Sequence, residues 1–101
     1  MATDLTSRKI TAFVGGYKRL AYGSVSIGTA GNATDMDTGL NTIDVAWVQL
    51  VGTTVGTADA TGYLTCEFGT DDGLVDIYCW DTTGVAATTD TVTIYVMAIG
   101  Q

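Results

Sequence analysis

The chain of 101 residues contains no histidine and no proline, and it has only four basic residues but eleven acidic ones. Histidine is the commonest general base and a common zinc ligand, so its absence excludes serine–histidine–aspartate triads and cysteine–histidine dyads. The sequence also lacks a phosphate-binding glycine loop of the Walker type. We therefore expect a protein that is not an enzyme and that holds no metal or other cofactor.

Acidic residues gather in two short segments, the first with Asp35 and Asp37 and the second with Asp71, Asp72 and Asp76. Oxygen-rich loops bind calcium in many proteins. Neither segment has the twelve-residue spacing of an EF-hand loop or its closing glutamate. The favoured interpretation is a set of solvated carboxylates in turns.

Strong helix formers are scarce, whereas threonine occurs 19 times and glycine 13 times. β-Branched and aromatic residues favour strands, and Gly, Asn and Asp favour the turns between them. The composition predicts one all-β domain over residues 1–101, with a polar N-terminal arm over residues 1–9. We expect a small β-sandwich or a Greek-key or jelly-roll-like barrel of about six to eight antiparallel strands.

Residues 1–9 lack the apolar segment of a secretory signal, and no stretch approaches the roughly 20 apolar residues of a membrane span. The sequence thus predicts a chain made in the cytoplasm, with no membrane contact.

Alternation of apolar and polar residues marks the expected strands. The pattern of residues 43–51 predicts a central strand that is buried on both sides after its first few residues, with Trp47 in the core. The last apolar segment, residues 91–99, has apolar residues on both faces, which predicts a strand inside a sheet or at a subunit interface. Further strands are expected at residues 10–14 and 20–27, the second with a possible bulge at Gly23. Residues 63–80 are expected to form a hairpin. Loops are expected at residues 28–39 and 52–62.

The dipeptide Asp72-Gly73 predicts a two-residue type I′ turn in this hairpin. With that turn, Cys66 lies directly opposite Cys79 on the inward face of the hairpin. Two interpretations of this possible cross-strand thiol pair stay open, a disulfide and two reduced thiols packed as small apolar groups. Reduced thiols are favoured, because they are usual in a cytosolic product.

All basic residues lie in the first 19 positions, at Arg8, Lys9, Lys18 and Arg19, whereas residues 20–101 carry ten acidic residues and no basic one. Such an acidic body repels phosphate backbones, so nucleic-acid binding is not expected. The basic segment has two interpretations, a docking site for an acidic partner surface and a set of solubilising charges on an edge strand.

Three segments carry a resemblance to a known class of protein: YGSVSI at residues 22–27, TGLNTI at 38–43 and VTIYVMAIG at 92–100. Together they resemble small β-sandwich virion proteins of tailed bacteriophages. The resemblance implies a capsid decoration (cement) protein on the outer surface of the phage head, bound to the major capsid protein. It also implies a homo-oligomer, with a trimer favoured, and a location on the virion after synthesis in the host cytoplasm.

The resemblance maps no functional residue one by one, so the contact residues are inferred from charge and exposure. We expect the capsid contacts among the four basic residues Arg8, Lys9, Lys18 and Arg19. An oligomer or partner interface is expected among the aromatic and apolar residues Tyr78, Trp80, Tyr95 and Met97. The alternative function is a carbohydrate-binding module or fibre knob for host-surface glycans, with Trp80, Tyr78 and the acidic turn at residues 71–72 as contacts.

Overall fold

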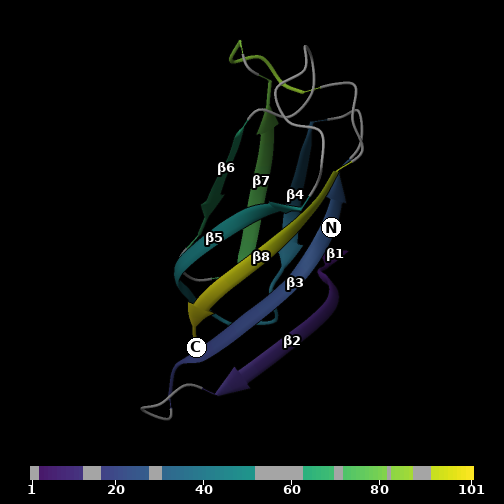
Figure 1. Cartoon of the computed structure of the whole chain (residues 1–101). Helices are drawn as coiled ribbons and strands as arrows, with labels where there is room; N and C mark the ends of the chain where they lie inside the picture. The colour runs from purple at the N-terminus through teal and green to yellow at the C-terminus, as the bar shows by residue number, and fades with distance from the viewer. Residues whose placement is uncertain are drawn as a thin grey trace.

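The computed structural model describes residues 3–12, 17–27, 31–51, 63–69, 72–81, 83–87 and 92–101, and this part of the chain is all-β. Its strands form two four-stranded sheets that pack as a small β-sandwich, so the predicted fold class is confirmed (Figure 1). The strands are β1 (Thr3–Asp4), β2 (Thr6–Ala12), β3 (Arg19–Ile27), β4 (Asn32–Asp37), β5 (Ile43–Val51), β6 (Tyr63–Phe68), β7 (Leu74–Trp80) and β8 (Val92–Gly100).

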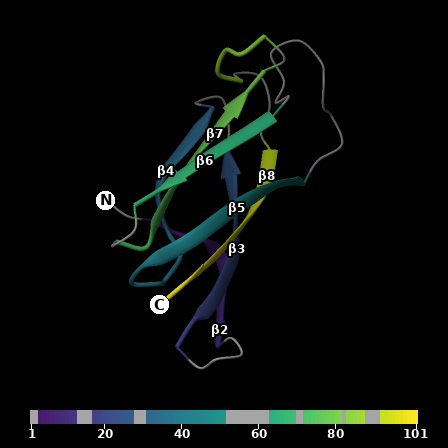
Figure 2. The same cartoon turned by 90° about the vertical axis from the view of Figure 1, so that its left-hand side faces the viewer.

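The first sheet, sheet A, has the strand order β1-β4-β7-β6, and the second, sheet B, has the order β2-β3-β8-β5. Neighbouring strands are antiparallel except for β1 and β4, which pair in parallel. Figure 2 shows the two layers from the side, with β4, β7 and β6 in one and β2, β3, β8 and β5 in the other. The chain changes sheets at Leu5, which is 3% exposed between β1 and β2.

The core lies between the sheets and is built from the inward-facing residues of the interior strands. Val75 and Ile77 of β7 and Ile94 and Val96 of β8 have no solvent exposure. Burying an aliphatic side chain of this size stabilises a fold by about 1.5–3 kcal/mol, so these four positions contribute strongly to stability. The interior position of β8 agrees with the two-sided apolar pattern of its sequence.

The prediction of a central strand at residues 43–51 is wrong, because β5 is an edge strand of sheet B. Ala46, Val48 and Leu50 pack against the core, whereas Trp47 faces outward and is 40% exposed. A strand with apolar residues on both faces has the same sequence pattern whether its outer face packs against another layer of the protein or is exposed at the surface. The expected place of Trp47 in the core is therefore also wrong.

Two polar segments hold strands that alternation does not reveal. Residues 32–37, within the expected loop 28–39, form β4, and part of the expected arm 1–9 forms β1 and the beginning of β2. In β4 the register shifts between Ala33 and Met36, and Asp35 has a φ of 56°. This bulge breaks the two-residue alternation on which the prediction depended. The expected loop at residues 52–62 lies outside the described residues.

The hairpin of β6 and β7 exists, but its predicted register is wrong by two residues. Cys66 lies opposite Ile77, and Cys79 lies opposite Leu64, so the two cysteines are diagonal neighbours instead of a directly opposed pair. Diagonal neighbours have Cα atoms about 7–8 Å apart, beyond the usual disulfide range of about 4.4–6.8 Å. Because the shift is even, each side chain still faces the predicted side of the sheet.

The turn explains the shift. Gly73 has the predicted positive φ, 71°, but Asp72 does not, so the two-residue type I′ turn is absent. Instead the Leu74 N–H donates to Asp72 Oδ1 at 3.1 Å, which is the contact of an Asx turn. Asp71, which the type I′ turn would place opposite Leu74, lies outside the described residues.

The bulge predicted at Gly23 of β3 lies instead in β2, the strand that pairs with β3 at this point. The β2–β3 register shifts between Thr6 and Lys9, where Ser7 has a φ of 53°. A Cβ atom on Gly23 would lie 2.7 Å from the Cβ of Leu5, so glycine allows the bulged strand to approach β3.

Candidate functional site

The outer face of sheet B is an exposed apolar surface, which we call the apolar face. Sheet B lies nearer the viewer in Figure 1. The cross-strand register sets these side chains in rows, in which Met97 of β8 lies between Tyr22 of β3 and Trp47 of β5. The residues that define the apolar face are Tyr22, Val45, Trp47, Tyr95, Met97 and Ile99.

Exposure of this surface is high for apolar side chains. Tyr22 and Trp47 are each 40% exposed, Val45 is 43% exposed and Tyr95 is 49% exposed. The outward-facing positions that are paired across β3, β8 and β5 carry no charge. The exposed Asp44, in the bulge at the beginning of β5, pairs with Lys18. A surface of this kind on a small soluble domain typically marks an interaction site, because its contact with water is unfavourable.

The outer face of sheet A has a different chemistry, because it carries a row of three aromatic rings. The Trp80 ring lies between those of Tyr63 and Tyr78, with centroid separations of 6.4 and 6.3 Å and interplanar angles of 21° and 30°. Trp80 Nε1 donates to Thr65 Oγ1 at 2.8 Å, which fixes the indole on the sheet. Two of the rings, those of Tyr78 and Trp80, border a depression of about 340 Å³ that Thr65, Cys66 and Glu67 also line.

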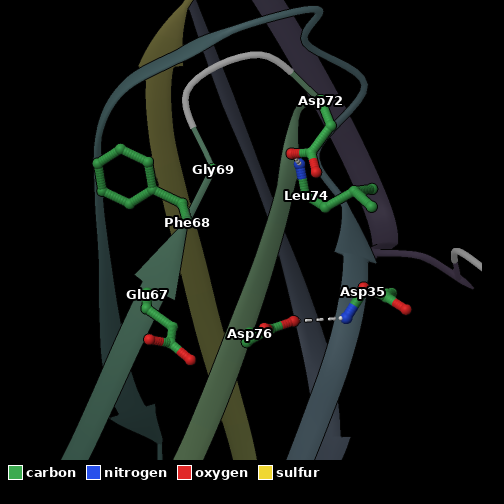
Figure 3. Close-up of a pocket in the computed structure, with 7 residues that line it drawn as sticks. All are labelled: Asp35, Glu67, Phe68, Gly69, Asp72, Leu74 and Asp76. Atoms are coloured by element: carbon green, nitrogen blue, oxygen red, sulfur yellow. Dashed lines mark hydrogen bonds between the residues drawn. The ribbon is translucent and has the colours of Figure 1, made fainter.

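On the same outer face of sheet A, a group of carboxylates lies between the aromatic rings and the β6–β7 turn. A depression of about 250 Å³ is lined by Asp35, Glu67, Asp72 and Asp76, together with Phe68, Gly69 and Leu74. Figure 3 shows how these side chains lie. The Asp35 N–H donates to Asp76 Oδ1 at 2.8 Å. Among the described residues, no group of three or more acidic or cysteine side chains is arranged to hold a metal ion.

Tyr78 joins the aromatic row to the acidic side of this face. Its hydroxyl donates to Glu67 Oε1 at 3.3 Å. Desolvation raises the pKa of Tyr78, and the negative charges of Asp76 and Glu67 and the hydrogen bond to Glu67 raise it further. The hydroxyl therefore stays protonated and keeps its role as a donor at neutral pH.

The expected interface residues are divided between the two outer faces. Tyr95 and Met97 belong to the apolar face, whereas Tyr78 and Trp80 belong to the outer face of sheet A. The structure thus does not bring the four together in one surface. Alternation in the sequence places Tyr78 and Trp80 on the outer side of the hairpin, where the structure has them. The contact of Tyr63 with Trp80 could not be predicted in this way, because it depends on the observed register, which pairs the two residues.

The four basic residues are not equivalent. The Arg8 guanidinium lies 3.0 Å from Asp4 and 3.7 Å from Asp37, and Lys18 pairs with Asp44. In the described part of the chain, no ion pair involves Lys9 or Arg19. Lys9 lies opposite Tyr22, at the β2 rim of the apolar face. Of the expected capsid contacts, Lys9 and Arg19 therefore have charges that are available to a partner.

A buried carboxylate, which sequence reasoning missed, organises the segment after β7. Asp81 is 4% exposed, and its Oδ1 accepts hydrogen bonds from the Thr83 hydroxyl, the Thr83 N–H and the Val85 N–H at 2.7, 2.8 and 3.1 Å. The Thr83 hydroxyl and these N–H groups lower the pKa of Asp81. Its role is to shape the turn, because all of these partners are local.

No helix in the described ranges is long and apolar enough to cross a membrane. Comparison of the chain with protein-family models, with curated proteins and with solved structures finds no match in any of the three.

Proposed function

We propose that the protein is a structural component of a virion, a cement protein that binds the outer surface of a tailed-phage head. The observation that supports this proposal is the apolar face, a largely uncharged and exposed sheet surface on a chain with a net charge of −7. A flat face of this kind suits docking against another protein surface, whereas small ligands are usually held in concave pockets. The major capsid protein is the proposed partner of the assembly.

Lys9 and Arg19 are the proposed electrostatic contacts with the capsid, because Arg8 and Lys18 pair with carboxylates of their own chain. Charges at the rim of an interface mainly guide association and are weakened by salt. The contact should therefore depend on ionic strength, and the double variant Lys9→Ala, Arg19→Ala should weaken it.

The test is co-sedimentation of the chain with head shells assembled from the major capsid protein of the same phage. We expect saturable binding that falls about tenfold in the double variant at low salt. Lys18→Ala is the matched control, because it removes a basic charge that is already paired with Asp44. Absence of co-sedimentation at low salt would overturn the proposal.

A second candidate function is glycan binding by the outer face of sheet A. The aromatic row of Tyr63, Trp80 and Tyr78 supports it, since nearly parallel rings offer flat apolar surfaces beside hydroxyl and carboxylate groups. The test is a glycan array probed with and without calcium. Binding should disappear in Trp80→Ala and persist in Trp47→Ala, which removes the same residue type from the opposite face; silence of the array in both conditions removes this candidate.

A further inference from the structure

We propose that the apolar face packs against the same face of a second copy of this chain, which gives a two-fold symmetric dimer. This inference rests on the proposed function as an assembly protein. It assigns the apolar face to a second copy, so that the capsid is contacted through Lys9 and Arg19 and not through this face. Two observations indicate that a second copy of the chain covers the apolar face: the size of the face and the distribution of charge over the two sheets.

The size of the face fits a dimer interface. Sheet B has four strands, of which β3, β5 and β8 are nine residues long. With a strand spacing of about 4.8 Å and a rise of about 3.3 Å per residue, the three strands that carry the apolar face measure about 14 by 30 Å. Because side chains corrugate the surface, two such faces bury at least roughly 850 Å² together, which is the size of a small, reversible interface.

The charges favour the same face of a second copy over the other sheet. The outer face of sheet A carries Asp35, Glu67 and Asp76. Packing the apolar face of one copy on that surface would remove these three carboxylates from water with at most Lys9 and Arg19 to pair with them, because residues 20–101 contain no basic residue. Between two apolar faces, the exposed carboxylate from β3, β5 and β8 is Asp44, which already pairs with Lys18 of its own chain. Contact of a surface with itself is the isologous arrangement of a two-fold dimer.

The middle of the face has the side chains that dominate protein interfaces. Tyr22, Met97 and Trp47 form one row across β3, β8 and β5. Tryptophan and tyrosine are enriched at interface positions that contribute most to binding, and methionine adapts its shape to a partner. Lys9 lies beside this row on the edge strand β2, where its ammonium group can remain in water at the rim.

The experiment measures the mass of the full chain in solution by sedimentation equilibrium, at concentrations up to about 100 µM. We expect a particle of twice the chain mass of 10.5 kDa. Tyr95→Glu should raise the dimer dissociation constant at least about a hundredfold, because it places a charge in the contact. Tyr63→Glu is the matched control: Tyr63 is 47% exposed on the opposite sheet and Tyr95 is 49% exposed, so the control should remain a dimer.

Thermal unfolding of each variant establishes that it is folded. If Tyr95→Glu fails to fold, Val45→Glu tests the same face from the edge strand β5, where Val45 is 43% exposed. A monomer at the highest concentration would overturn the inference. So would a three-fold assembly, or a dimer that Tyr63→Glu dissociates and Tyr95→Glu does not.

The outcome is separable from that of the capsid experiment. A chain that is monomeric alone and co-sediments with head shells refutes the dimer and supports the cement function. Conversely, a dimer that Tyr95→Glu dissociates, together with no binding to head shells, supports the dimer and refutes the cement function.

Discussion

Thr38 binds the carbonyl oxygen of Gly73 twice, through its backbone N–H at 3.1 Å and its hydroxyl at 2.8 Å. The same hydroxyl accepts the N–H of Leu40 at 3.2 Å, and Thr38 has no solvent exposure. This contact joins the end of β4 to the turn before β7. It also gives the β6–β7 turn its shape, because the Gly73 carbonyl is directed toward Thr38 and away from the hairpin ladder.

Thr38→Val should destabilise the fold by about 1–3 kcal/mol, because it keeps the shape of the side chain and removes a buried hydroxyl with two partners. The free energy of unfolding in urea measures the effect. Thr38→Ser is the matched control, since it retains the hydroxyl and should lose no more than about 1 kcal/mol for the missing methyl group. Equal losses in the two variants would show that the hydroxyl is not the important group.

Gly73→Ala should destabilise the protein by about 3 kcal/mol or more, because strain at positive φ is combined with a steric clash. A Cβ atom at this buried position would overlap the carbonyl oxygen of Leu40. Gly84→Ala provides the comparison: its φ is 87°, also positive, but its nearest neighbour would be the Tyr63 hydroxyl at 3.8 Å. We expect a loss of only about 1 kcal/mol there, and similar urea midpoints for the two variants would contradict this explanation.

Asp81 should make stability depend on pH in the acid range. Its folded-state pKa is lowered by hydrogen bonds from Thr83 and Val85. Its stabilising contribution is therefore complete above its unfolded pKa of about 3.9 and is lost as the pH falls through the lower folded-state value. Asp81→Asn should be less stable than the parent chain near about pH 6, and the difference should shrink at lower pH. Urea midpoints across this range measure it; a constant difference would contradict the prediction.

Cys66 should react slowly with alkylating reagents. Burial raises the pKa of its thiol, and its Sγ lies 3.9 Å from the carbonyl oxygen of Ala46. Because the thiolate is the reactive form, we expect alkylation by iodoacetamide at about pH 8 to be at least about tenfold slower than in the urea-unfolded chain. Peptide mapping by mass spectrometry resolves the site, and equal rates in the folded and unfolded chain would count against a shielded thiol.

The sequence predicts strands best where alternation is regular. In β7 and β8 every second residue faces the core, and both strands are found within the expected segments. Alternation fails in β4, since the bulge at Asp35 separates its two inward-facing apolar residues, Ala33 and Met36. The hairpin register fails for another reason: a contact with Thr38, 35 residues away in sequence, overrides the local preference of Asp72-Gly73.

The candidate surfaces could be predicted only in part. The outward side of Tyr78 and Trp80 follows from the hairpin pattern, whereas the apolar face depends on which strands are neighbours in sheet B. Apolar residues on both sides of β5 indicate burial when sequence alone is considered. Only the packing of two sheets, in which Trp47 lies beside Met97 on the outer face of sheet B, shows that one side of β5 is left at the surface.

The place of β8 between β3 and β5 has a consequence for the order in which the protein forms during synthesis. The segments for β3 and β5 leave the ribosome before residues 92–100, so neither can complete its hydrogen-bonded ladder at first. Sheet A needs only residues 3–80, and its strands can pair earlier. Until β8 arrives, the nascent chain exposes apolar strand segments, which is the stage at which a chaperone would protect it from aggregation.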